Sequence, residues 1–170
     1  MECLYSALPW MIFIMTSAMH EVVVIADTSC LIALSNIQGI SILRDLYRVV
    51  YITPEIANEL GEALPEWIIV RDFNSKDQMR ILSVLLDKGE ASAISLAFEF
   101  EKVLLILDDL KGRKEAVRLG FRITGTLGVL VRARSMGIIP ELRPHIEKLL
   151  ASGFRISAQV LELLLSEDAS

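Results

Sequence analysis

The sequence has few cysteines and few histidines, with two of each among 170 residues. Cys3 and Cys30 do not form the closely spaced pairs that bind zinc, and two cysteines cannot supply a disulfide framework. We therefore expect a reducing, cytoplasmic location. His20 and His145 lie outside the segments that carry the acids described below, so no catalytic triad built on histidine is predicted.

The chain also lacks an excess of basic residues. It has 17 Lys and Arg against 22 Asp and Glu, and its net charge is −5. Proteins that coat nucleic acid are usually basic, so this class is disfavoured. A nuclease is not excluded, because the carboxylates of a metal site are themselves a source of negative charge. Hydrophobic residues make up 53% of the chain, which argues against disorder and for a packed core.

No long apolar run is present. The stretch Leu8 to Met15 is well short of the roughly 20 residues that span a bilayer, so no membrane association is expected. No Lys or Arg precedes it, which disfavours a signal peptide.

Residues 1–20 are either a surface arm or the result of a non-native start, with Met19 as the functional start. We expect residues 21–170 to form a single domain that includes the C-terminal helices.

Predicted strands alternate with predicted helices along the chain. The strands are expected at 22–26, 49–52, 67–70, 103–107 and 121–123. In the first half of the chain, helices are expected at 29–34, at 40–46, after Thr53-Pro54, and from Ser75 to about 86. Further helices are expected at 89–101, from after Asp109 to 119, from 126 to before 137, at 141–151 and at 157–166. Lys88-Gly89 is expected to separate two helices. This alternation predicts an α/β domain with a mostly parallel sheet.

Acidic residues follow the two most strongly predicted strands. The run Val22 to Ala26 ends at Asp27, and the run Val103 to Leu107 ends at Asp108 and Asp109. Continuous apolar runs are typical of central strands in a parallel sheet. Because ligands gather beyond the carboxyl ends of such strands, we expect these carboxylates to meet at one edge of the sheet.

Two further acids lie on helices that are expected to begin at or pass this edge. Glu59 follows the helix-start signal Thr53-Pro54, and Glu90 follows Gly89 at a helix N-terminus. Gathered carboxylates repel one another, and their pKa values rise unless a cation lies between them. Mg²⁺ with oxygen ligands would remove this repulsion and activate water for attack on a phosphodiester.

Each acid also has a structural interpretation that the sequence leaves open. Asp27 and the Asp108-Asp109 pair can cap the helices that follow them. Glu90 can be an ordinary first-turn glutamate, and Glu59 can lie on an exposed helix face. Spacing alone does not decide between a metal site and a set of helix caps.

Four segments, taken in order, resemble the PIN-domain family, in particular a subgroup of short prokaryotic PIN-like proteins described as a domain of unknown function. They are VVIADTSCLIAL, ITPEIANEL, KGEASAISLA and LLILDDLKGRKEAVRLGFRITGTLGVLVRARSMGII. The resemblance covers roughly residues 21–165. It implies a Rossmann-like three-layer α/β/α sandwich with a mainly parallel sheet. It also implies a metal-dependent ribonuclease, which in many members is the toxin of a toxin–antitoxin pair.

The resemblance assigns roles to residues by motif. Asp27, Glu59, Glu90 and Asp109 match the family's acids and are expected to be catalytic. Asp27, Glu90 and Asp109, with the neighbouring Asp108, are expected to hold Mg²⁺ or Mn²⁺. Which member of the Asp108-Asp109 pair faces the metal is left open, with Asp109 favoured.

Substrate contacts are expected beside these acids. Ser29 matches a small hydroxyl residue next to the first acid. Many family toxins carry a further acid shortly after the fourth strand, whereas this chain has none at 110–112, so the number of metal ions is open. Lys111, Arg113 and Lys114 either contact phosphate or lie on a solvated helix face. Thr124, with Gly125 and Thr126 after it, either lines the site or belongs to a turn with a helix cap.

Three functions follow as hypotheses. The first is an endoribonuclease acting on single-stranded or loop RNA, with a small antitoxin as protein partner and a homodimer as a further option. The second is a PIN-fold interaction module with weak or no catalysis. The third, a phosphatase of the haloacid dehalogenase class, is disfavoured because the residues after Asp27 do not follow the D-x-D-x-T pattern.

Overall fold

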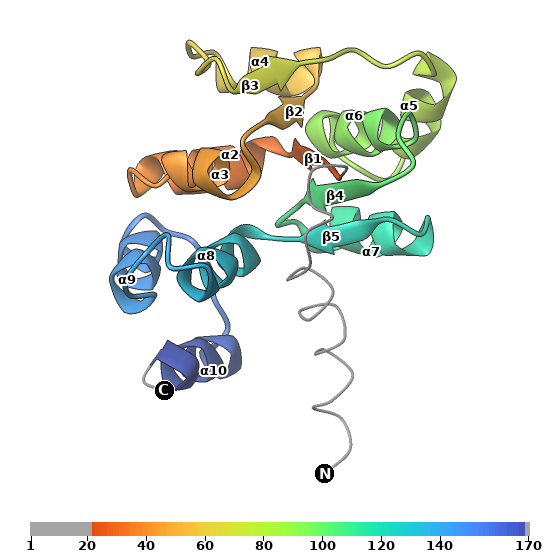
Figure 1. Ribbon diagram of the computed structural model, residues 1–170. Coiled ribbons are helices and arrows are strands. Elements are labelled where there is room, and N and C mark those ends of the chain that lie inside the picture. The colour runs from red at the N-terminus through yellow and green to blue at the C-terminus, as the bar shows by residue number, and fades with distance from the viewer. Residues whose placement is uncertain (1–21, 169–170) are drawn as a thin grey trace.

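The computed structural model describes residues 22–168 and shows a parallel sheet with helices on both faces (Figure 1). The described strands are β1 (Val23–Ala26), β2 (Val50–Ile52), β3 (Ile68–Val70), β4 (Val103–Ile106) and β5 (Arg122–Thr124). Their order across the sheet is β3-β2-β1-β4-β5, and each pairing is parallel. The predicted parallel sheet is therefore confirmed.

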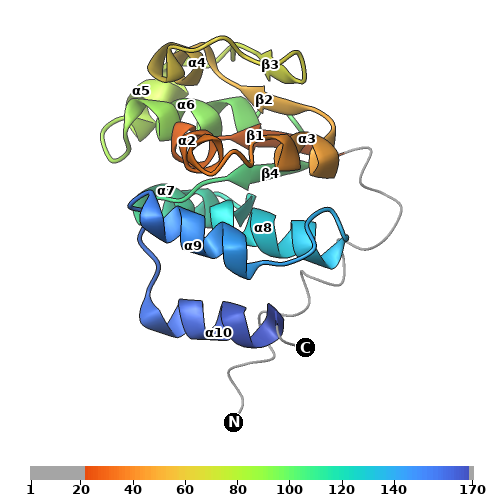
Figure 2. The same ribbon diagram turned by 90° about the vertical axis from the view of Figure 1, so that its left-hand side faces the viewer.

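The helices form a layer on each side of the sheet. On the left in Figure 1 lie α2 (Thr28–Asn36), α3 (Ser41–Tyr47), α8 (Thr126–Ser135) and α9 (Arg143–Ala151). On the right lie α5 (Lys76–Leu82), α6 (Lys88–Ala97) and α7 (Leu110–Arg118). Helix α4 (Pro54–Leu60) contacts both α2 and α6. Helix α10 (Ala158–Asp168) lies beyond the β5 edge of the sheet (Figure 1) and below α9 in Figure 2. This is the expected three-layer α/β/α sandwich.

Strands β1 and β4 lie next to each other in the middle of the sheet. Val23 to Ala26 pair residue by residue with Val103 to Ile106. Ile25 and Leu105 have no exposed surface, because helices cover both faces of these strands. The expectation that the two strands preceding the acids are central neighbours is confirmed, and their carboxyl ends open onto the same edge.

One expected helix boundary is wrong. Lys88 and Gly89 do not separate two helices; they are the first two residues of α6. Asp87 caps this helix, because its carboxylate accepts from the Glu90 backbone N–H at 2.8 Å and Glu90 Oε2 accepts from the Asp87 backbone N–H at 3.3 Å. This reciprocal capping box outweighs the low helix propensity of glycine. The preceding helix α5 ends at Leu82, earlier than expected.

The expectations for residues 1–20 fall outside the described part of the chain, and the domain boundary at residue 21 stays a prediction. Within the described part, no helix has both the length and the apolar character needed to cross a membrane.

Candidate active site

Asp27 lies directly after β1, at the carboxyl edge of the sheet. Its side chain is buried, with 5% of the residue exposed. The Ser29 hydroxyl donates to Asp27 Oδ2 at 2.8 Å. Burial raises the pKa of Asp27 to about 6; the Ser29 bond opposes this rise and the negative charge of Asp87 adds to it. A carboxyl group in this setting binds a proton or a cation more readily than one in water.

Glu90 lies in the first turn of α6 and is 3% exposed. Its Oε2 atom completes the capping box, whereas its buried Oε1 atom has no hydrogen-bond partner among the residues described. Burial raises the pKa of Glu90 to about 7, and the negative charges of Asp87, Asp109 and Asp27 add to the rise. A buried carboxylate oxygen without a partner is costly, so a proton or a cation is expected there.

Asp109 is the N-cap of α7. Its Oδ1 atom accepts from the backbone N–H groups of Lys111 at 2.7 Å and Gly112 at 3.3 Å. Partial burial acts to raise the pKa of Asp109, but these two bonds, and a hydrogen bond available from a protonated Glu90, hold it below its ordinary value. Asp109 is therefore the ionised partner of the Glu90 carboxyl group.

Asp108 makes a different set of contacts. Its Oδ1 atom accepts from the Thr126 backbone N–H at 2.8 Å, and its Oδ2 atom accepts from the Thr126 hydroxyl at 2.5 Å. Both oxygens are thus engaged in joining the end of β4 to the start of α8. Between the two adjacent aspartates, the geometry favours Asp109 as the one that faces Glu90.

Glu59 reaches the site from α4. Its Oε2 atom accepts from the Thr28 hydroxyl at 2.8 Å, next to Asp27 in the chain. Asp27 Oδ1 and Glu59 Oε2 each lie 3.1 Å from the position that a Cβ atom on Gly89 would occupy. The absence of a side chain at Gly89 therefore lets the two carboxylates converge. Four elements far apart in sequence supply Asp27, Glu59, Glu90 and Asp109 to one edge.

The residues expected to contact substrate have different surroundings. Ser29 and Lys111 are exposed beside Asp27 and Asp109, respectively. Arg113 is half-buried, and its Nη1 atom donates to the Leu107 carbonyl at 3.0 Å. Thr124 is buried, and its hydroxyl group packs against Gly128 of α8. A Cβ atom at Gly128 would stand only 2.2 Å from the Thr124 hydroxyl oxygen. Ser29 and Lys111 are thus the better placed for substrate.

Sequence reasoning missed Asp87 and Thr28 at this edge, and it did not predict the contact that Thr126 makes. Asp87 adds a negative charge felt by both buried acids, and its spacing from Glu90 was a visible capping-box signal. Thr28 anchors Glu59, and Thr126 anchors Asp108. These two hydroxyl contacts join residues 31 and 18 positions apart, so no local pattern indicates them.

The donor set fits a hydrated Mg²⁺ or Mn²⁺. Within residues 22–168, no group of three or more His, Cys, Asp or Glu side chains is arranged to hold a metal ion. Mg²⁺ does not require such a group, because one or two carboxylates plus water and substrate phosphate satisfy it. Asp27 and Glu90 supply two buried carboxyl groups, and Glu90 Oε1 is the oxygen that has no other partner.

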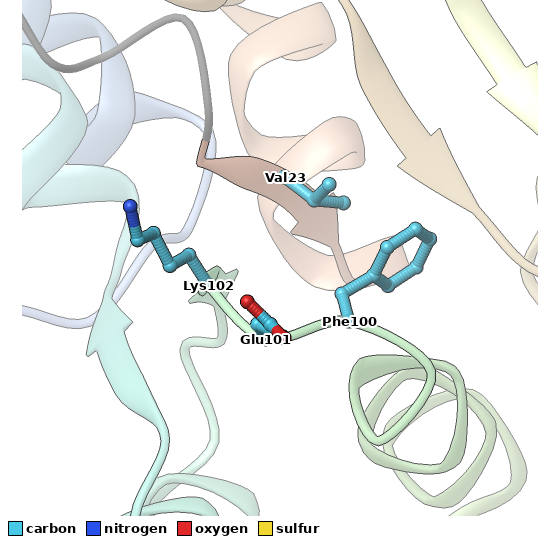
Figure 3. Close-up of a pocket in the computed structure, with 4 residues that line it drawn as sticks. All are labelled: Val23, Phe100, Glu101 and Lys102. Atoms are coloured by element: carbon cyan, nitrogen blue, oxygen red, sulfur yellow. The ribbon is translucent and has the colours of Figure 1, made fainter.

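A hollow elsewhere on the surface does not coincide with these acids. It is lined by Val23, Phe100, Glu101 and Lys102, at the amino ends of β1 and β4 (Figure 3). This is the opposite edge of the sheet from Asp27, so we assign the chemistry to the carboxyl edge.

The sandwich and the acids at its carboxyl edge define a nuclease-like α/β fold. A family model described as PIN domain matches residues 23–169, so the chain belongs to the PIN-domain family. PIN domains are generally nucleases and typically use divalent metal ions. Comparison with curated proteins gives no match.

Proposed function

We propose that this protein is an endoribonuclease that depends on Mg²⁺ or Mn²⁺ and acts in the cytoplasm as the toxin of a toxin–antitoxin pair. The observation that carries the proposal is the buried, unpartnered Oε1 atom of Glu90, which lies in the same cluster as buried Asp27 and ionised Asp109. Membership of the PIN-domain family supports the nuclease part of it.

In this proposal Asp27, Glu90 and Asp109 would hold the ion, directly or through bound water, and the ion would lower the pKa of a water and stabilise negative charge on the phosphodiester. The Ser29 hydroxyl keeps Asp27 Oδ2 in place. Glu59 Oε2 is held by the Thr28 hydroxyl, which leaves Glu59 Oε1 to accept a proton from the attacking water.

In this proposal RNA is bound mainly through the metal site and its neighbouring residues, and less through charges elsewhere on the protein surface. The net charge of −5 provides no basic platform, so phosphate contacts come from the ion and from the exposed Lys111 at the start of α7. Single-stranded or loop RNA suits such a site, because its backbone can approach a buried edge more closely than a duplex can.

The test is cleavage of a mixed RNA pool by metal-free protein to which Mg²⁺ or Mn²⁺ is added back. We expect cutting that EDTA abolishes and that Asp27→Asn reduces by at least a hundredfold, the order found when a key electrostatic group is lost. Asp77→Asn is the matched control, because Asp77 is an exposed acid on α5. Equal cutting by Asp27→Asn and the native protein would remove Asp27 from the mechanism.

A second candidate function, a protein-interaction module, is favoured by one surface. Ile81, Val84 and Leu85, on α5 and the turn after it, are 71%, 80% and 64% exposed. Contiguous exposed apolar side chains of this kind mark protein interfaces. In the nuclease proposal the same surface receives the antitoxin or a second copy of the chain. Mn²⁺ titration separates the functions, because a module without a metal site does not bind the ion.

A further inference from the structure

Gly112 lies against the Glu90 carboxyl group, between two of the proposed metal-binding acids. A Cβ atom at position 112 would stand 2.8 Å from Glu90 Oε1 and 3.0 Å from Glu90 Cδ. Gly112 is buried, and its backbone N–H donates to Asp109 Oδ1. One residue therefore touches both acids: it holds Asp109 through its backbone and leaves room for Glu90 by having no side chain.

The atoms that a side chain at 112 would meet belong to the end of a flexible glutamate, not to backbone. A methyl group there can be accommodated if the Glu90 carboxylate moves away from α7. The first turn of α7 is regular helix, in which alanine is more favourable than glycine. We therefore expect G112A to leave the fold intact and to displace the Glu90 carboxylate.

We propose that Gly112 is a positioning residue for the metal site: its missing side chain leaves room for the Glu90 carboxylate on the Asp109 side of α7, where Glu90 and Asp109 would be available to the same divalent cation. This inference rests on the proposed function, since it concerns the same site.

The experiment measures Mn²⁺ affinity by calorimetry on metal-free native protein, G112A, E90D and E90D/G112A. We expect G112A to weaken Mn²⁺ binding about tenfold, within the range found when groups that orient metal ligands are changed. E90D shortens the side chain by one methylene group and so removes the clash. We therefore expect G112A to change the affinity of the E90D protein by no more than about twofold.

Val117→Ala is the matched control, because Val117 is an exposed, uncharged residue on the same helix. It should leave Mn²⁺ binding unchanged. Circular dichroism and thermal melting establish that each variant is folded. If G112A alone failed to fold, a folded E90D/G112A protein that binds Mn²⁺ like E90D would still support the clash with Glu90.

Three results would overturn the inference. They are native-like Mn²⁺ affinity in folded G112A, an equal loss in both Glu90 backgrounds, and unfolding of both proteins that carry G112A. The proposed function fails in a different way, through native protein that binds no Mn²⁺ at all.

Discussion

Replacing Asp27 by asparagine should stabilise the protein when no metal ion is present. Asp27 is 5% exposed, and its folded-state pKa of about 6 lies above the ordinary value of 3.8. The folded state therefore keeps the proton to higher pH than the unfolded chain does. The stability that protonated Asp27 contributes is complete below about pH 4 and is lost as the pH rises through about 6.

The size of the effect follows from the pKa difference. Each pKa unit corresponds to about 1.4 kcal/mol, so ionised Asp27 destabilises the metal-free fold by about 3 kcal/mol at pH 8. Asparagine stays neutral and can still accept the Ser29 hydrogen bond. For a domain of this size 1 kcal/mol moves Tm by about 2–4 °C, so Asp27→Asn should melt roughly 6–12 °C higher.

The assay is thermal unfolding followed by circular dichroism in EDTA at pH 4.5 and pH 8, with and without Mn²⁺. The advantage of Asp27→Asn should be largest at pH 8 and about a third as large at pH 4.5, where Asp27 is ionised mainly in the unfolded chain. Saturating Mn²⁺ should raise the Tm of the native protein and leave that of the variant nearly unchanged. Asp77→Asn should show neither effect, since Asp77 is exposed. A variant less stable than native protein in EDTA at pH 8 would refute the reasoning.

Three further predictions concern the surroundings of the site. Thr126→Val should lower the free energy of unfolding by about 1–3 kcal/mol in urea titrations, because half-buried Asp108 loses a hydroxyl donor; an unchanged midpoint would contradict this. Asp87→Asn keeps the helix cap but removes a negative charge, so the pKa of Glu90 should fall, as NMR titration of the carboxyl carbons in EDTA would reveal. Val84→Asp should alter stability by less than about 0.5 kcal/mol and should reduce self-association or partner capture in gel filtration; native-like association would exclude this surface.

The sequence was informative where structure follows from local pattern and sheet topology. Continuous apolar runs before Asp27 and Asp108 indicate strands that are buried on both faces. Parallel pairing then places their carboxyl ends at one edge, whatever the details of packing. The positions of β1 and β4, and the placement of Asp27 and Asp109 at the same edge of the sheet, could therefore be predicted from those runs alone.

Other features depend on how separate elements pack. Nothing near Asp108 in the sequence indicates that Thr126 engages both of its oxygens. The orphaned Oε1 atom of Glu90 depends on α6 and α7 lying side by side with Gly112 at the contact. The low helix propensity of Gly89 alone indicates a helix break, whereas the Asp87 capping box makes Gly89 the second residue of α6.

The register between β1 and β4 places the acids at two depths. Ala26, the last residue of β1, pairs with Ile106, the last residue of β4. Asp27 is therefore the first residue after its strand, whereas Asp109 is the third residue after its strand, beyond Leu107 and Asp108. Asp109 is exposed and ionised, whereas Asp27 and Glu90 are buried, and their raised pKa values of about 6 and about 7 leave both partly protonated at pH 6. In the proposed function, Asp27 and Glu90 would release their protons when they bind the ion, so metal occupancy should rise between pH 6 and 8.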